Sequence, residues 1–306
     1  MLVLVENLLM KNTKSGIFLI VWDLLSQIGK SFLMAVPPIR RWRLKRPRTS
    51  LYINDTNKYL SENAFFGFDL LLKYAGDIRG KSICEIGAGD FLASGLSMLA
   101  TGAERYAVID RFPGNYASVL AKEMYTRIAE NWKSFYPEIP WDKSIDAAKF
   151  PEEYSQRLEL IGKPIEYAAS SQKFDIVCSF QVGEHVSDIQ AFANIHNRLL
   201  KPGGIGLHRV DFGPHDVWSA YDDPTTFLRF PKFIWKLTGS NRGIPNRHRH
   251  HEFMDAFEKA NLNVEVLLME HFDEERVAYK KLNSMFLSMP RESVLVQTAV
   301  YRLQSK

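Results

Sequence analysis

Cysteine is scarce in this sequence of 306 residues, and Cys84 and Cys178 each lie inside an apolar run. Neither has another cysteine or a histidine at the spacing of a zinc ligand set, which excludes a disulfide scaffold and a structural zinc site. No apolar run free of charge reaches the roughly 18 residues of a membrane span. Hydrophobic residues at 46% and charged residues at 24% indicate a globular protein, and the unpaired cysteines favour a reducing compartment.

Positive charge is concentrated in residues 1–50, which hold nine Lys or Arg against only Glu6 and Asp23. This arm carries +7, and because the whole chain carries +4, residues 51–306 carry −3. A body with this charge is not a general nucleic-acid binder. The composition therefore predicts a basic arm, residues 1–50, followed by a near-neutral domain, residues 51–306, with no nucleic-acid partner.

Residues 17–36 predict an amphipathic helix that ends at Pro37 and Pro38. Asp23, Gln27 and Lys30 share a polar arc with two serines. The apolar arc consists of Val21, Leu24, Leu25, Ile28, Phe32 and Val36. Because an ionised group at the centre of a span costs roughly 2.5 to 3.5 kcal/mol, two of them disfavour a spanning helix.

Six cations surround Trp42 in residues 40–48, directly after the predicted helix. A basic cluster beside an amphipathic helix is typical of contact with anionic lipid headgroups. The expected localisation is therefore cytoplasmic, with peripheral contact at the inner face of the membrane. The alternative is that the helix packs on the protein's own body or on the second subunit of a homodimer.

From residue 63 the sequence alternates short β-branched runs with longer helical patterns. The strand candidates are residues 82–86, 105–110, 165–168, 174–180, 204–210, 264–269 and 294–302. The helix candidates are residues 63–75, 116–132, 189–200 and 252–260. This alternation predicts an α/β fold with an open, mostly parallel sheet and helices on both faces.

The sharpest local motif is SICEIGAGD at residues 82–90, a buried strand that runs into the glycines Gly87 and Gly89. Glycines at such a turn let the backbone approach a ligand closely. Leu92 stands where a dinucleotide fingerprint has its third glycine, which disfavours NAD and FAD. Asp110 ends the next strand, where its carboxylate can accept both hydroxyls of a ribose.

The ordered motifs EIGAGD, YAVID, FDIVCSFQVGEHVSD and LLKPGG resemble the class I S-adenosylmethionine-dependent methyltransferase family. The resemblance covers about residues 65–302. It implies a Rossmann-like sheet of seven strands in the order 3-2-1-4-5-7-6, with only the last strand antiparallel. It also implies S-adenosylmethionine as the cofactor.

Carried over by position, the resemblance assigns a set of residues to the cofactor. These are Glu85, Gly87, Ala88 and Gly89 around the methionine part, Asp110 and Arg111 at the ribose, Ala169 and Ser170 at the adenine, and Phe180 and Gln181 beside them. Residues 167–172 lack the acidic residue often found beside the adenine, so a hydroxyl or a backbone amide is expected to make that contact.

The Glu-His-Val segment at residues 184–186 resembles ubiquinone-pathway O-methyltransferases, in which an upstream carboxylate joins the Glu-His pair at a metal. Here the upstream residue is Gln181, and a neutral amide is a poorer ligand for a hard cation than a carboxylate. No metal site is therefore predicted.

Methyl transfer to a hydroxyl requires a group that removes the proton, and a histidine suits that task. His208, at the end of a predicted strand, is the first candidate for a general base, with substrate hydrogen bonding or a structural role as alternatives. His185 and Glu184 follow the fourth strand as further candidates, although loop positioning also explains them. His215 is a candidate for substrate binding.

Arg247 and Arg249 lie in a loop with three histidines, residues 246–251. Two guanidiniums in one loop favour an anionic group on the acceptor, and a solvated basic loop is the alternative. The sequence therefore predicts O-methylation of a small amphiphilic or anionic acceptor, such as a sugar of a surface polysaccharide or a lipid-linked precursor. N-methylation of a small amine or amino acid, and a catalytically silent partner protein at the membrane, are the alternatives.

Overall fold

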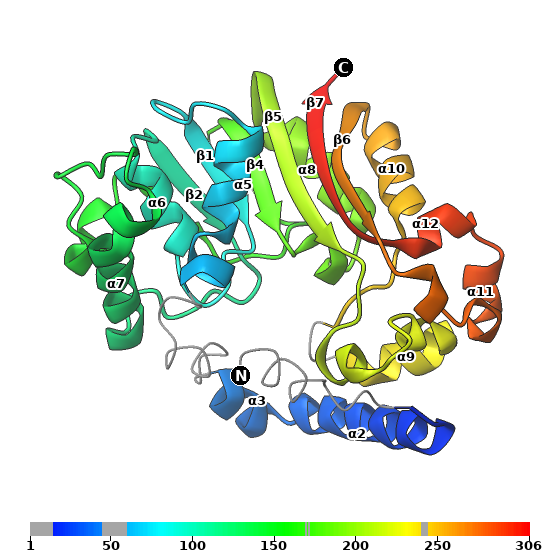
Figure 1. Cartoon of the computed structure of the whole chain (residues 1–306). Coiled ribbons are helices and arrows are strands. Elements are labelled where there is room, and N and C mark those ends of the chain that lie inside the picture. Colours follow the sequence, from blue (N-terminus) through cyan, green and yellow to red (C-terminus); the bar gives the residue numbers. More distant parts are fainter. Residues whose placement is uncertain (1–14, 45–59, 169, 171, 240–243) are drawn as a thin grey trace, which may run out of the picture. The chain divides into compact units, whose positions relative to one another are not determined.

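The computed structural model describes residues 15–44, 60–168, 170, 172–239 and 244–306 (Figure 1). The chain forms two compact units. Unit 1 comprises residues 1–45, 211–253 and 269–299, and unit 2 comprises residues 46–210, 254–268 and 300–306. Residues 15–44 therefore share a unit with two later segments, a grouping that composition alone did not indicate.

Seven strands form one sheet in the order β3-β2-β1-β4-β5-β7-β6, which confirms the predicted topology. The strands are β1 (Ser82–Ile86), β2 (Arg105–Ile109), β3 (Leu158–Ile161), β4 (Phe174–Phe180), β5 (Leu200–Asp211), β6 (Leu262–His271) and β7 (Val296–Ser305). The pairs from β3 through β5 are parallel. The last strand, β7, runs against them (Figure 1).

The helices match the predicted alternation, with boundaries moved by a few residues. They are α2 (Ile17–Ala35), α3 (Pro37–Leu44), α5 (Phe66–Tyr74), α6 (Ala93–Ala100), α7 (Val119–Phe135), α8 (Ile189–Leu199), α9 (Lys232–Gly239), α10 (His250–Lys259), α11 (Ser284–Leu287) and α12 (Arg291–Leu295). Helix α7 begins three residues later than predicted because the Ser118 side chain accepts a hydrogen bond from the Ala121 N–H at 3.2 Å.

In unit 2 the side chains of β1, β2 and β4 alternate between the two faces of the sheet. Ile83, Val108 and Cys178 join one core cluster with helices α5, α6 and α7. Figure 1 shows α5 and α6 on one face of these strands and α8 on the other. Because both faces of the sheet are covered, these strands consist mainly of apolar residues. That pattern made the strands predictable from the sequence.

The third strand was predicted in the wrong place. The structure puts β3 at Leu158–Ile161, whereas residues 165–168 form a turn that begins at Pro164. Strand β3 is only four residues long, Glu159 interrupts its apolar residues, and only its two end residues are buried. The residues that follow the proline are held in the turn by the hydrogen bond from the Tyr167 N–H to the Pro164 carbonyl at 3.0 Å.

Helix α8 is joined to the sheet by a chain of buried hydrogen bonds. Ser179 Oγ lies 2.8 Å from His208 Nδ1, and His208 Nε2 lies 2.6 Å from His196 Nε2. His196 Nδ1 lies 2.9 Å from the Ala193 carbonyl, which can only accept. Donation therefore runs from Ser179 through His208 and His196 to Ala193, and both imidazoles are neutral.

This chain predicts a specific loss of stability in acid. Burial lowers the pKa of His196 to about 4 and that of His208 well below 6.5, with the His196 charge adding to the second shift. Both pKa values are depressed in the folded state, so the unfolded chain takes up protons first. The contribution to stability is complete above pH 6.5 and is lost as the pH falls toward 4.

We expect the parent's advantage over the double variant His196→Gln/His208→Gln to fall by about 1 to 3 kcal/mol per pH unit between pH 6.5 and 4.5. Urea unfolding of both proteins at several pH values measures it. Burial raises the pKa of Glu85 to about 7, which gives stability the opposite dependence on pH. Because Glu85 is present in both proteins, its effect cancels in the comparison. A difference in unfolding free energy that does not change with pH would contradict the assignment of neutral imidazoles.

Candidate functional site

The candidate site lies in unit 2, at the edge where parallel strands end. Strands β1, β2 and β4 end at Ile86, Ile109 and Phe180, and Gly87, Asp110 and Gln181 follow directly. Glu85 of β1 is in register with Val108 of β2 and with Cys178 of β4. The register therefore brings three of the predicted cofactor residues to the same edge of the sheet.

Gly87 is required by its backbone and by its neighbour. Its φ is +78°, a left-handed value that favours glycine, and its N–H donates to the Ile109 carbonyl at 2.8 Å. A Cβ at this position would lie 2.5 Å from the Val182 side chain. Val182 was not singled out from the sequence, and it joins the glycine loop to the loop after β4.

Gly89 and Asp110 form the open part of the same loop. Gly89 has φ +75°, and among the described residues no atom lies within 4 Å of a Cβ built on it. Its N–H donates to one oxygen of the Asp110 carboxylate at 3.3 Å, while the other oxygen accepts from the Phe112 N–H at 2.7 Å. The Asp110 carboxylate thus connects the glycine loop to the loop after β2, next to the open space at Gly89.

Glu85 is 4% exposed and lies beneath the loop rather than on its surface. Tyr106 donates to its carboxylate at 2.6 Å. Burial and the nearby charge of Asp110 raise the pKa of Glu85 to about 7, although the Tyr106 hydrogen bond opposes them. In this structure Glu85 supports the glycine loop from within the core.

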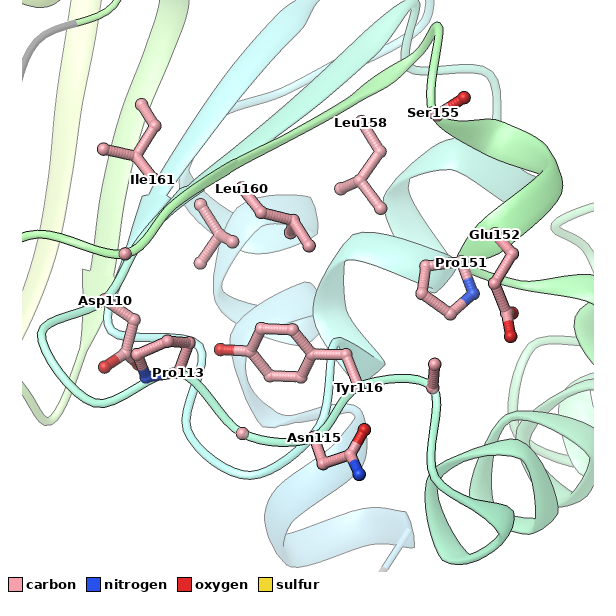
Figure 2. A pocket seen from close by; sticks show the side chains of 14 residues that line it. Asp110, Pro113, Asn115, Tyr116, Pro151, Glu152, Ser155, Leu158, Leu160 and Ile161 are labelled. Carbon is pink, nitrogen blue, oxygen red and sulfur yellow. The ribbon is translucent and has the colours of Figure 1, made fainter.

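A cavity of about 480 Å³ opens beside Asp110 (Figure 2). Its walls are mainly apolar and come from β2, β3, the loop after β2 and the segment before β3. The lining residues include Val108, Pro113, Tyr116, Pro151, Leu158, Leu160, Ile161 and Gly162. Tyr116 belongs to the wall of the cavity (Figure 2). Its hydroxyl oxygen is buried, and burial and then the Asp110 charge raise its pKa.

A second group of side chains lies where β4 and β5 end. Phe180 is in register with Arg209, and the Gln181 N–H donates to the Arg209 carbonyl at 2.9 Å. The Arg209 guanidinium lies over the Phe66 ring, 4.8 Å from its centroid. Phe180 packs so closely on α5 that a Cβ at Gly67 would lie 2.5 Å from its ring. Sequence analysis identified Phe180 and Gln181 but missed Arg209 and Phe66.

The contacts of two remaining predicted cofactor residues, Ser170 and Arg111, are with other side chains of this protein, and a third residue is outside the described part of the chain. The Ser170 hydroxyl donates to Glu159 of β3 at 3.0 Å. Arg111 is exposed, with its guanidinium 5.2 Å from the centroid of Phe112. Ala169 falls outside the described residues, and Ala88 is half-buried in the glycine loop.

His208 is not positioned as the predicted general base. It is fully buried, and both ring nitrogens take part in the hydrogen-bond chain between Ser179 and His196. A ring without exposed atoms cannot accept a proton from a bound hydroxyl. His208 therefore joins β4, β5 and α8 as a core residue.

The other candidates after β4 differ in exposure. Glu184 is buried and His185 is exposed, in the short helix Gly183–His185 of unit 2. His215 belongs to unit 1, where its Nε2 lies 3.7 Å from the Asp211 carboxylate. Of the predicted histidines in unit 2, His185 is the one with an accessible ring.

Arg247 and Arg249 are buried core residues of unit 1, so the prediction that they hold an anionic acceptor is corrected. Arg249 donates to the carbonyls of Phe212, Val294 and Val296 at 2.7 to 3.0 Å. Arg247 donates to two further carbonyls and lies over the Trp235 ring. Burial lowers the pKa of Arg247 to about 9, and Arg249 adds to this shift.

Comparison with known proteins places the chain in a family. The model of the methyltransferase domain family matches residues 57–267. Similar solved structures include the S-adenosylmethionine-dependent methyltransferase of Mesorhizobium loti, with 15% identity and a TM-score of 0.43 over 80% of this chain and 99% of that chain. Phosphoethanolamine N-methyltransferase 2 of Haemonchus contortus has 14% identity and a TM-score of 0.46 over 84% of this chain and 58% of that chain.

The YcgJ protein of Bacillus subtilis has 14% identity and a TM-score of 0.43 over 78% of this chain and 98% of that chain. The search of curated proteins found no match. The family model, by contrast, spans more than half of the chain and includes the glycine loop, Asp110 and the segment after β4. The chain therefore belongs to the methyltransferase domain family and is an S-adenosylmethionine-dependent methyltransferase.

Proposed function

We propose that this methyltransferase modifies a hydroxyl oxygen of a small acceptor that carries an anionic or amphiphilic part. A sugar of a surface polysaccharide, or its lipid-linked precursor, belongs to this class. The observation that carries the proposal is Arg209, a partly exposed arginine near the end of β5 whose Nη1 has no hydrogen-bond partner among the described residues. An acceptor oxygen with negative charge would satisfy that donor.

The residues at the strand edge fit the cofactor. Open space at Gly89 accommodates the methionine part, and Asp110 has the carboxylate that ribose hydroxyls require. The apolar cavity beside Asp110, with the Tyr116 hydroxyl in its wall, suits a flat base. When bound, S-adenosylmethionine supplies an electrophilic methyl group on a sulfonium.

Arg209 is suited to orient an acceptor because two contacts fix its position. Its backbone carbonyl accepts from the Gln181 N–H, and its guanidinium lies over the Phe66 ring. A partly enclosed guanidinium N–H without a partner is costly, so a ligand oxygen gains more there than at the surface. Arg209 replaces Arg247 and Arg249 as the residue that we assign to the anionic group.

Proton removal from the acceptor falls to His185 in this proposal. Its ring is exposed at the end of β4, on the same unit as Gly87 and Asp110, whereas His208 is enclosed in the core. A neutral imidazole is a side chain that can accept a hydroxyl proton. Glu184 is buried beside it and acts in this proposal by positioning the loop.

The cofactor assignment predicts the effect of Asp110→Ala. Loss of the ribose partners and of the loop contacts should weaken binding by about 1.5 to 3 kcal/mol, which raises the dissociation constant for S-adenosylmethionine at least about tenfold. Calorimetry measures this constant. Asp77→Ala is the matched control, because that carboxylate is exposed and pairs only with Arg79 in the described contacts. Equal affinity in both variants would remove Asp110 from the site.

The acceptor assignment predicts the effect of Arg209→Leu. Leucine leaves an apolar side chain beside Phe66 but removes the guanidinium and its donors, so KM for the acceptor should rise about tenfold or more while cofactor affinity stays within about twofold. Arg209→Lys should be intermediate, because it keeps the charge and loses the planar fork. Arg79→Leu, at an exposed arginine, is the control. Unchanged KM in Arg209→Leu would overturn the role of Arg209.

The acceptor atom is identified by transfer of radiolabelled methyl groups into a cell extract. An O-methyl ether keeps its label in base, and acid hydrolysis releases it as a methylated sugar. Label retained on a cation exchanger after hydrolysis would instead indicate N-methylation. A protein that neither binds S-adenosylmethionine nor transfers label would be a silent partner.

A further inference from the structure

Helix α2 packs on unit 1 through its polar side. Asp23, Gln27 and Ser31 are buried together with Ile20, at the spacing of one helical face. The Tyr221 hydroxyl donates to the Asp23 carboxylate at 2.8 Å. Ile20 joins a core cluster with Trp218, Phe227 and Trp235. The polar arc predicted from the sequence is therefore the side attached to the protein.

The apolar side of α2 is consequently exposed. Phe18, Trp22 and Phe32 are 78%, 63% and 62% exposed. The other exposed apolar residues of the segment are Ile17, Leu19, Val21, Leu25, Leu33, Val36, Ile39 and Trp42. Helix α9, which packs against α2, adds the exposed side chains of Phe233 and Leu237. An apolar helix face of this length is uncommon on a soluble monomer and marks an interaction surface.

Charge and aromatic residues identify what this face contacts. Residues 40–48, which follow α2 closely, hold six Lys or Arg and no acidic residue. Trp22 and Trp42 are exposed on α2 and α3, and tryptophan is enriched at the boundary between headgroups and acyl chains. Apolar side chains next to a segment with only basic charges are complementary to a bilayer with hydrocarbon chains and anionic headgroups.

We infer that α2 and α3 form a membrane-binding surface that lays the exposed apolar face of α2 into the headgroup boundary of an anionic bilayer. In the part of the chain that the structure describes, α2 is the one helix long and apolar enough to cross a membrane. Crossing would separate Asp23 from Tyr221 and carry a carboxylate into hydrocarbon. With its polar side held by unit 1, α2 lies along the surface instead.

The test measures binding of the full-length protein to vesicles of phosphatidylcholine, alone or mixed with phosphatidylglycerol. The parent should float with the mixed vesicles at low salt. Binding should weaken at 1 M salt, where the Debye length falls to about 3 Å from about 10 Å at 0.1 M. Leu25→Glu and Phe32→Glu change exposed side chains, and each should weaken binding at least about tenfold. Val119→Glu is the matched control, because that valine is 86% exposed on α7 of unit 2.

Two further measurements determine how deeply α2 enters the bilayer and whether the protein forms a dimer. Trp22 fluorescence, obtained by difference from Trp22→Phe, should be quenched more by lipids brominated near the headgroup than at the chain end. Stronger quenching at the chain end would overturn the surface orientation. Equal binding of Leu25→Glu, Phe32→Glu and Val119→Glu would overturn the proposal. So would a lipid-free dimer that Leu25→Glu and Phe32→Glu dissociate, because a second copy would then cover the face.

Vesicle binding does not depend on methyl transfer, so it is independent of the proposed function. Cofactor affinity should be equal in the parent, Leu25→Glu and Phe32→Glu, because Asp110 belongs to unit 2 and α2 to unit 1. Loss of vesicle binding with normal cofactor affinity would locate the defect in the membrane-binding surface. Normal vesicle binding by a protein without cofactor affinity would leave this surface intact and contradict the enzymatic proposal alone.

Discussion

The hydrogen-bond register of the parallel strands is the constraint on which the site depends. Once β2, β1 and β4 are paired, their ends must lie at one edge, and the residue after each strand is brought there whatever its identity. Gly87 and Gln181 then leave their strands with φ of +78° and +59°. Such backbone is costly for glutamine and persists only where the surroundings hold it, and here Arg209 and Phe180 do so.

Several residues of types that often act in catalysis are core residues here, because buried polar groups need hydrogen-bond partners and these side chains supply them. Arg249 satisfies three buried carbonyls, one directly after β5 and two at the junction of α12 and β7. His196 and His208 satisfy each other and a serine across a sheet and a helix. A guanidinium or an imidazole can therefore be a structural connector, and only its surroundings distinguish that use from chemistry.

The sequence predicted whatever depends on local pattern. Buried strands such as β1 and β4 consist mainly of apolar residues, and the glycine loop between Ile86 and Asp90 has a recognisable spacing. The edge strand β3 escaped prediction because it is only four residues long and Glu159 interrupts its apolar residues. Arg209 escaped because its importance arises from contacts with Phe66 and Gln181, which are distant in sequence. Which side of α2 faces the protein also depended on a distant residue, Tyr221.

The contact between Asp23 and Tyr221 joins residues 198 positions apart, and this separation has a consequence for synthesis. At a typical rate of about 5 to 20 residues per second, α2 leaves the ribosome tens of seconds or so before its partner exists. During that interval neither side of the helix has its final neighbour. Closure of so long a loop comes late in folding. If α2 of the nascent chain is already bound to a membrane, the rest of unit 1 folds against a helix that is held in place. Membrane binding and the folding of unit 1 are then coupled.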